Sequence, residues 1–177
     1  MPTGHAFMAM SLDGFVARKD HSLDWLLKQR TDGEEHGYAE FLAGVDGLVM
    51  GSGSFRTCLS FDSWPYDKPV IVLSQSMTNA DVPDELRGSV RISPLSPDQV
   101  MASLGREGWA RVYVDGGKII QSFMRAGLIS DLTVTIVPIL IGEGMRMFGE
   151  TGRDIDLELL ATTPFPSGLV SLTYRVA

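Results

Sequence analysis

The sequence predicts an α/β domain of three layers, in which a mixed, mostly parallel central sheet is flanked by helices and ends in an antiparallel hairpin. Three observations lead to this prediction. Residues 48–50 and 69–73 are continuous apolar runs, which are typical of parallel strands buried on both faces. Segments with apolar residues at helical spacing separate such runs. The last two runs, residues 155–159 and 169–176, alternate instead and favour a hairpin at one sheet edge.

The first strand comes close to the start of the chain. Residues 7–12 are apolar, Asp13-Gly14 is a strong turn dipeptide, and residues 15–17 resume in extended form. The strand is therefore expected to bend near its end.

Two helices are predicted from capping patterns. Thr31 or Asp32 precedes two glutamates, which are favourable in a first turn, so a helix is expected to begin there. Ser96 followed by Pro97 is the second such start. Residues 81–87 between them are expected to form a loop with one helical turn, and residues 90–92 a short strand.

The second half of the chain repeats the alternation of strand and helix. Residues 112–114 are apolar, residues 119–125 have helical spacing, and Gly127 is expected to end that helix. Residues 131–137 are rich in β-branched side chains and predict a further strand.

Two glycine-rich turns follow two of these strands. One is Gly51-Ser-Gly-Ser54 and the other Gly116-Gly117. Glycine allows a ligand to approach the backbone closely, and the N–H groups at a helix start attract anions. Each turn alone is equally consistent with tight packing, but the pair suggests a dinucleotide with its phosphates between them. The Gly-x-Gly-x-x-Gly fingerprint and the P-loop pattern are both absent.

Composition restricts the class of protein further. The 177 residues suit one domain, 1–177, and the net charge of −7 argues against nonspecific binding of nucleic acid. A single cysteine and three scattered histidines show no spacing for metal ligands, so no metal is expected. No apolar run is long enough to span a membrane, and we expect a cytoplasmic protein without membrane contacts.

The ordered motifs resemble those of one known group. They include Met10-Ser-Leu-Asp-Gly-Phe-Val-Ala17, Val114-Asp-Gly-Gly117 and the stretch 127–142. Together they resemble the dihydrofolate reductase-like superfamily, and within it the riboflavin-biosynthesis reductases (RibD C-terminal domain-like). The resemblance extends over most of the chain and implies a dihydrofolate reductase-like fold.

The resemblance implies NADPH as cofactor, laid across the carboxyl ends of the central strands. The residues that match nicotinamide positions are Ala9, Val16 and Ala17. Those that match the adenosine side of the pyrophosphate are Gly51, Ser52, Ser54 and Phe55. Those that match the adenosine ribose phosphate are Ser74 and Gln75, and those that cradle the pyrophosphate are Gly116, Gly117, Lys118 and Ile119. The family usually has Gly-Arg-x-Thr after the second strand, and in this chain Ser52 replaces that arginine, so NADH is not excluded, although Arg56 could compensate.

The resemblance also implies residues at the substrate end. Asp13 matches an aspartate near the substrate and is our candidate proton donor, although Asp13-Gly14 could equally serve as a turn. Glu34 and Glu35 lie in the segment that carries the acid of dihydrofolate reductases, but not at the matching spacing. Trp25, Thr135 and Glu143 match or lie close to positions around the substrate; Trp25 could instead be plain core.

These features predict an NAD(P)H-dependent reductase that transfers a hydride to a small heterocyclic or imine-like molecule. The reaction would be similar to that of 5-amino-6-(5-phosphoribosylamino)uracil reductase of riboflavin biosynthesis, without an attached deaminase domain. The alternative is a nonenzymatic nucleotide-binding or regulatory protein that retains the fold. A homodimer is expected, formed through an exposed β edge or residues 138–148.

Overall fold

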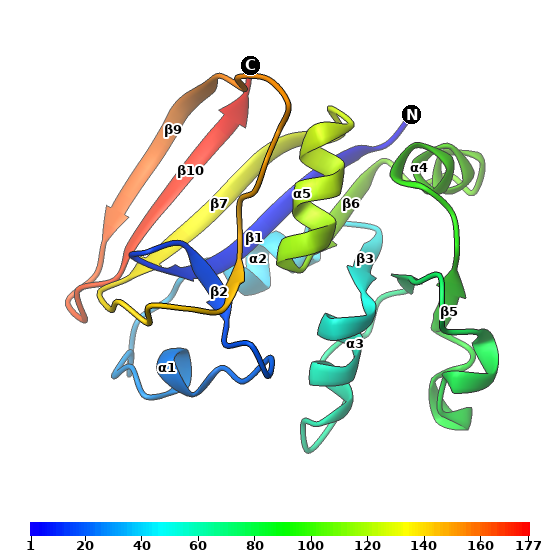
Figure 1. The fold of residues 1–177 in the computed structure, drawn as a ribbon, viewed down its shortest axis with the longest axis horizontal. Coiled ribbons are helices and arrows are strands. Elements are labelled where there is room, and N and C mark those ends of the chain that lie inside the picture. Colours follow the sequence, from blue (N-terminus) through cyan, green and yellow to red (C-terminus); the bar gives the residue numbers. More distant parts are fainter.

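The computed structural model describes all 177 residues and contains one large sheet with helices on both faces (Figure 1). In chain order the elements are β1 (Thr3–Ser11), β2 (Phe15–Ala17), α1 (Asp24–Leu27), α2 (Tyr38–Ala43), β3 (Gly47–Gly51), α3 (Ser52–Leu59), β4 (Val70–Leu73), β5 (Val90–Ser93), α4 (Pro97–Arg106), β6 (Arg111–Asp115), α5 (Gly117–Arg125), β7 (Ile129–Val137), β8 (Met145–Arg146), β9 (Leu157–Pro164) and β10 (Val170–Val176). A short 3-10 helix, Asp84–Leu86, is the helical turn expected within residues 81–87, and a second one, Asn79–Asp81, precedes it.

The sheet has eight strands in the order β5-β4-β3-β6-β1-β7-β10-β9. The strands from β5 to β7 are parallel, and β10 and β9 add to this set in antiparallel fashion. The predicted fold class is therefore confirmed, including the hairpin at the sheet edge. A separate two-stranded ribbon, β2 with β8, was not foreseen.

Alternate residues of the central strands serve two different cores. Val49 packs with the buried side chains of α4 and α5 on one face of the sheet. Its neighbours Leu48 and Met50 pack with α3 and with the apolar face of α2 on the other. All three side chains are fully buried, which explains why the sequence of β3 shows no polar alternation.

Helix starts were only partly as expected. Ser96 caps α4 in a capping box with Gln99, as the sequence indicated. At α3 the N-cap is Gly51, and no side chain caps the helix, so the serines of the first glycine turn do not cap it. Their hydroxyls are therefore not committed to the helix backbone.

The helix expected at Thr31 or Asp32 begins only at Tyr38. Glu34, whose side chain was expected in its first turn, instead accepts hydrogen bonds from the backbone and hydroxyl of Ser167, at 2.7 and 2.8 Å. It also pairs with His36 at 2.9 Å. These tertiary contacts hold residues 31–37 in turns, because they fix the carboxylate outside any helical geometry.

Strand β9 is shifted from its expected range. It runs from Leu157 to Pro164, and a bulge interrupts its pairing with β10 between Thr173 and Tyr174. Proline is tolerated at the end of an edge strand, where no partner needs its missing N–H. None of the helices has the length and apolar character required to cross a membrane.

Candidate functional site

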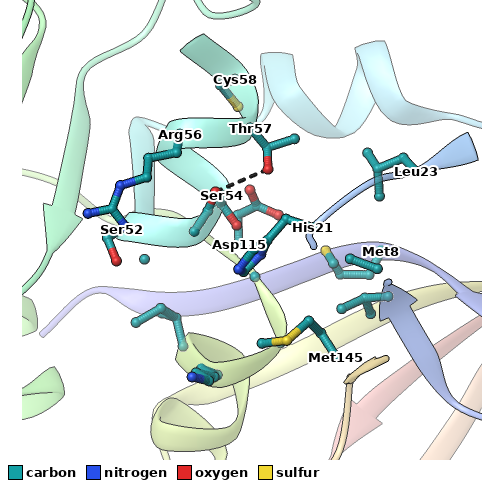
Figure 2. Close-up of a pocket in the computed structure, with 18 of the residues that line it drawn as sticks. Met8, His21, Leu23, Ser52, Ser54, Arg56, Thr57, Cys58, Asp115 and Met145 are labelled. Carbon is teal, nitrogen blue, oxygen red and sulfur yellow. Dashed lines mark hydrogen bonds between the residues drawn. The ribbon is translucent and has the colours of Figure 1, made fainter. Parts of the chain in front are cut away.

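A cavity of about 720 Å³ lies at the carboxyl ends of β3, β4 and β6, beside the middle of β1 (Figure 2). Its walls come from α3, the start of α5, the loop after β2, and the aromatic side chains Tyr38 and Tyr66. In open parallel sheets, ligands bind beyond the carboxyl ends of the strands, where helix starts face the cavity. The location is therefore that of a ligand site.

The two glycine turns meet in this cavity. Strands β3 and β6 are paired so that Met50 lies opposite Asp115, which brings their following turns side by side. A Cβ atom on Gly116 would lie 2.6 Å from Ser54 Oγ, and one on Gly51 would lie 3.0 Å from an Ile119 side-chain carbon. The turns are thus in contact, and glycine is required for that contact.

Both helix starts are open to an anion. Neither α3 nor α5 has a side-chain cap, so the first N–H groups of each helix lack an internal acceptor. Two cations, Arg56 and Lys118, line the cavity beside these starts and form no ion pair within the protein. Exposed N–H groups and unpaired cations make a seat for phosphate groups.

Arg56 brings a guanidinium close to position 52, where the family usually has an arginine. It lies four residues after Ser52, so the two side chains share one face of α3. Side chains on a helix lean toward its N-terminus, and Figure 2 shows the Arg56 side chain reaching back beside Ser52. The guanidinium absent at position 52 is therefore supplied from one turn further along.

Most of the expected cofactor residues line the cavity. These are Ala9, Val16, Ala17, Gly51, Ser52, Ser54, Gly116, Gly117, Lys118 and Ile119. Three do not. Phe55 is fully buried in the core beneath α3. Ser74 Oγ accepts hydrogen bonds from the backbone of Ser76 and Met77, and the Gln75 amide donates to the Pro94 carbonyl.

Asp13 lies outside the cavity lining and has a structural role. Its carboxylate accepts hydrogen bonds from Ser11 Oγ at 2.6 Å, Gly142 N at 2.8 Å and Ile141 N at 3.2 Å. The Ser11 hydroxyl and, to a lesser degree, the two amides lower the pKa of Asp13. An ionised carboxylate held by three donors is poorly suited to deliver a proton, so this geometry does not support the expected catalytic role.

The expected substrate residues also lie elsewhere. Trp25 is fully buried and packs with Val137 and Leu169 as part of the core. Thr135 is buried on β7, and its hydroxyl has no partner. Glu143 is exposed and pairs with Lys19. None of the three lines the cavity.

Asp115 is the carboxylate that sequence reasoning missed. It is the one acidic residue in the cavity lining, at the end of β6 directly before the second glycine turn. Burial raises its pKa from 3.8 to about 6. The Tyr113 hydroxyl lies 3.3 Å from Asp115 Oδ1 and 3.1 Å from the Phe7 carbonyl. A carboxylate ending a buried strand before Gly-Gly was the signal that could have identified it.

Further hydroxyl and thiol groups surround the same end of the cavity. Burial and, next in weight, the charge of Asp115 raise the pKa of Cys58 to about 11, and the same two causes raise the pKa of Tyr66. Burial also raises the pKa of Tyr113. All three groups are therefore neutral near pH 7 and can act as hydrogen-bond donors.

His21 forms part of the cavity wall at the start of α3. Its backbone has φ of 66°, a left-handed conformation rare for residues other than glycine. The imidazole lies against Gly53, where a Cβ atom would be 2.7 Å from the ring. The loop after β2 therefore contacts the start of α3 through this side chain.

Fold and site together define a dihydrofolate reductase-like domain with a ligand cavity at the carboxyl edge of its sheet. The chain belongs to the RibD C-terminal domain family, whose model matches residues 2–171. The resemblance inferred from the motifs is thereby confirmed.

Individual relatives agree with this assignment. A putative riboflavin biosynthesis protein from Shewanella sp. PV-4 is 35% identical, with a TM-score of 0.92 and 99% of each chain covered. The uncharacterized protein YwjB of Bacillus subtilis is 28% identical over 163 residues, which are 90% of each chain. The dihydrofolate reductase of Enterococcus faecalis is 16% identical, with a TM-score of 0.63 over 98% of this chain and 96% of the other, and shares the fold.

Proposed function

We propose that this protein is an NAD(P)H-dependent reductase that transfers a hydride to a small heterocyclic or imine-like substrate, in the manner of the riboflavin-pathway reductases. The observation that carries the proposal is the contact between the two glycine turns, which aligns two uncapped helix starts on one cavity. The similarity to a putative riboflavin biosynthesis protein and to a dihydrofolate reductase complexed with NADP(H) supports it.

The residues present fit such a cofactor. The N–H groups at the starts of α3 and α5 would hold the pyrophosphate, with Lys118 as counter-charge. Ala9, Val16 and Ala17 would form an apolar wall for the nicotinamide, because small and β-branched side chains leave room for a flat ring and exclude water. When bound, the cofactor would supply the hydride for the acceptor carbon.

Arg56 makes NADPH the preferred cofactor in this proposal. A guanidinium beside Ser52 can pair with the additional phosphate that distinguishes NADPH from NADH. The same residue weakens the alternative of a nonenzymatic nucleotide-binding protein, because the replacement of the family's arginine by Ser52 is the feature that favours that alternative.

Asp115 is the proposed proton donor in place of Asp13. Reduction of a C=N or C=O bond adds the hydride to carbon and leaves the electron pair on nitrogen or oxygen, which must then gain one proton. With its pKa raised to about 6, the carboxyl of Asp115 is partly protonated near neutral pH and lines the cavity. It can therefore give that proton to an atom facing it and regain one from solvent.

Titration of the purified protein with NADPH, followed by nicotinamide fluorescence, tests the first step. We expect saturable binding, followed by oxidation of NADPH when a pyrimidine, pterin or imine substrate is added. Absence of nucleotide binding would refute the proposal. Tight binding without oxidation across the whole panel would favour the nonenzymatic alternative.

A further inference from the structure

The half of the cavity that lies beyond the glycine turns is aromatic. It is bordered by Phe7, Leu26, Tyr38, Thr57, Phe61 and Tyr66, which we call the substrate end. The rings of Phe7 and Tyr38 are 5.4 Å apart and tilted, and those of Tyr38 and Tyr113 are 6.3 Å apart in an edge arrangement. Such walls suit a flat ring, which can stack on one aromatic face and meet the edge of another.

Positive charge in the cavity is confined to the other end. The lining contains three basic residues, Arg56, Lys118 and His21. Arg56 reaches back beside Ser52, Lys118 lies in the first turn of α5, and His21 lies on Gly53. The six residues of the substrate end include no lysine, arginine or histidine, and Asp115, next to the second glycine turn, is the one acidic residue of the cavity lining.

The direction of α3 strengthens this separation of charge. Gly53 and Thr57 lie one turn apart on α3, and Phe61 follows two residues after the helix ends; all three line the cavity, which therefore follows the length of the helix. The eight residues of α3 at 1.5 Å per residue span about 12 Å. The N-terminal end of the helix dipole favours anions and the C-terminal end, near Phe61, disfavours them.

We infer that the substrate is a flat, uncharged or basic ring compound without a phosphate group. A phosphate placed at the substrate end would be desolvated beside a carboxylate and the negative end of a helix, with no cation to pair with it. A ring nitrogen or N–H group would instead meet Asp115 and the hydroxyls around it. This inference rests on the proposed function and departs from the phosphoribosyl substrate of the reductase that the sequence resembles.

Matched pairs of compounds test the inference. The probes are 5-amino-6-ribosylaminouracil and pyridoxine, each compared with its own 5′-phosphate, and titrated by calorimetry into protein saturated with NADP⁺. We expect the unphosphorylated member of a pair to bind about tenfold or more tightly than its phosphate ester, as expected when a charged group is buried without a partner. Equal or tighter binding of the esters, or no binding of any neutral ring, would overturn the inference.

A substitution that adds charge makes the test sharper. Phe61→Arg places a cation at the substrate end, at a side chain that is 44% exposed and can accept the change without loss of folding. It should raise the affinity for the phosphate esters about tenfold relative to that for the neutral rings, so the measured quantity is the ratio within each pair. Leu59→Arg, on the same helix and 39% exposed but outside the cavity, is the control and should leave both affinities unchanged.

Failure of the inference can be told apart from failure of the proposed function. The titration with NADP⁺ alone comes first and reports on the nucleotide seat. Loss of that binding would refute the proposed function. Firm NADP⁺ binding combined with a preference for phosphate esters would refute only the substrate class.

Discussion

At the scale of single residues, two aspartates have opposite surroundings. Sequence analysis considered Asp13 both as a turn residue and as the proton donor, but the surroundings expected of a donor are those of Asp115. Asp13 is surrounded by donors and stays ionised, because the Ser11 hydroxyl and two amides stabilise its charge. Asp115 is surrounded by buried groups, and its charge is disfavoured. A proton donor at neutral pH needs the second environment.

Asp115→Asn is therefore expected to remove the donor. The rate constant kcat should fall about 100-fold, a common contribution of a general acid. In the unchanged protein kcat should decline as pH rises through about 6, where Asp115 loses its proton, and the variant should lack this decline. Stopped-flow measurements between pH 5 and 9 would show it. Asp13→Asn is the control and should keep the decline of kcat with pH. If this decline disappeared in Asp13→Asn but not in Asp115→Asn, Asp13 would be the proton donor.

The same residue predicts how stability changes with pH. The folded pKa of Asp115, about 6, lies above its ordinary value of 3.8, so the folded state binds the proton more tightly. Its contribution to stability is complete below about pH 3.8 and is lost as pH rises through 6. Asp115→Asn should therefore raise the free energy of unfolding at pH 8 by about 3 kcal/mol relative to the unchanged protein. Urea titrations at pH 5 and pH 8 would measure the difference, which should shrink at pH 5.

Arg56 and Lys118 are expected to separate two phosphate contacts. Arg56→Ala should weaken NADPH about tenfold and leave NADH unchanged, because only NADPH carries the additional phosphate. Lys118→Ala should weaken both nucleotides to a similar degree, since both contain the pyrophosphate. Fluorescence titrations of both variants with both nucleotides would measure these affinities. If Arg56→Ala lost affinity for NADPH and NADH equally, the Arg56 guanidinium would contact the pyrophosphate instead.

At the scale of elements, the turn between β6 and α5 combines backbone strain with close contact. Gly116 has φ of 95°, and a Cβ atom there would also meet Ser54 Oγ. Both requirements arise from the same geometry, in which two strand-to-helix turns share one cavity. The turn is thus a point where a single methyl group affects folding and binding together.

Gly116→Ala should lower the free energy of unfolding by about 1–3 kcal/mol and weaken NADPH binding by more than tenfold. Gly33→Ala is a matched control, because Gly33 has φ of 77° but no atom within 4 Å of its Cβ position, far from the cavity lining. It should show backbone strain without loss of affinity. Denaturation curves and nucleotide titrations on both variants separate the two effects, and normal NADPH affinity in Gly116→Ala would contradict the proposed seat.

The sequence predicted elements better than it predicted the positions of side chains. Continuous apolar runs identified β3, β4 and β6, because a strand buried on both faces leaves a clear pattern. The helix expected at Thr31 failed because Glu34 binds Ser167, a contact between residues 133 positions apart that no local pattern contains. The same limit applies to the site: glycine turns can be recognised locally, whereas the surroundings that distinguish Asp13 from Asp115 come from distant strands and loops.

At the scale of the whole molecule, β9 is an edge strand with leucines exposed on it. Every residue of β9 is exposed, with Leu157 at 41%, Leu159 at 54% and Leu160 at 49%. An edge strand with unpaired backbone groups and apolar side chains is a site for pairing with another chain. The homodimer remains a prediction, and β9 is where we expect its interface.

Leu159→Lys should convert the expected dimer into a monomer, because a charge at the edge strand opposes pairing. Leu140→Lys tests the alternative interface in residues 138–148, since Leu140 is 68% exposed; we expect it to leave the dimer intact. Sedimentation velocity at micromolar concentration would report the mass of each variant. A monomeric unchanged protein would show the prediction to be wrong, and a monomer in Leu140→Lys alone would move the interface.

The cavity wall made by β2 and β8 is held in place by contacts with several other segments. Asp13 joins it to residues 141 and 142, Gly14 accepts a hydrogen bond from Met147, and the Arg146 carbonyl lies so close to Gly117 that a Cβ there would be 2.4 Å away. The loop at His21 is held by two ion pairs with exposed side chains, Arg18–Asp24 and Lys19–Glu143, and by backbone hydrogen bonds within the loop. Molecules should therefore enter and leave past His21, and any slow release of product should respond to changes in that loop rather than in the ribbon opposite.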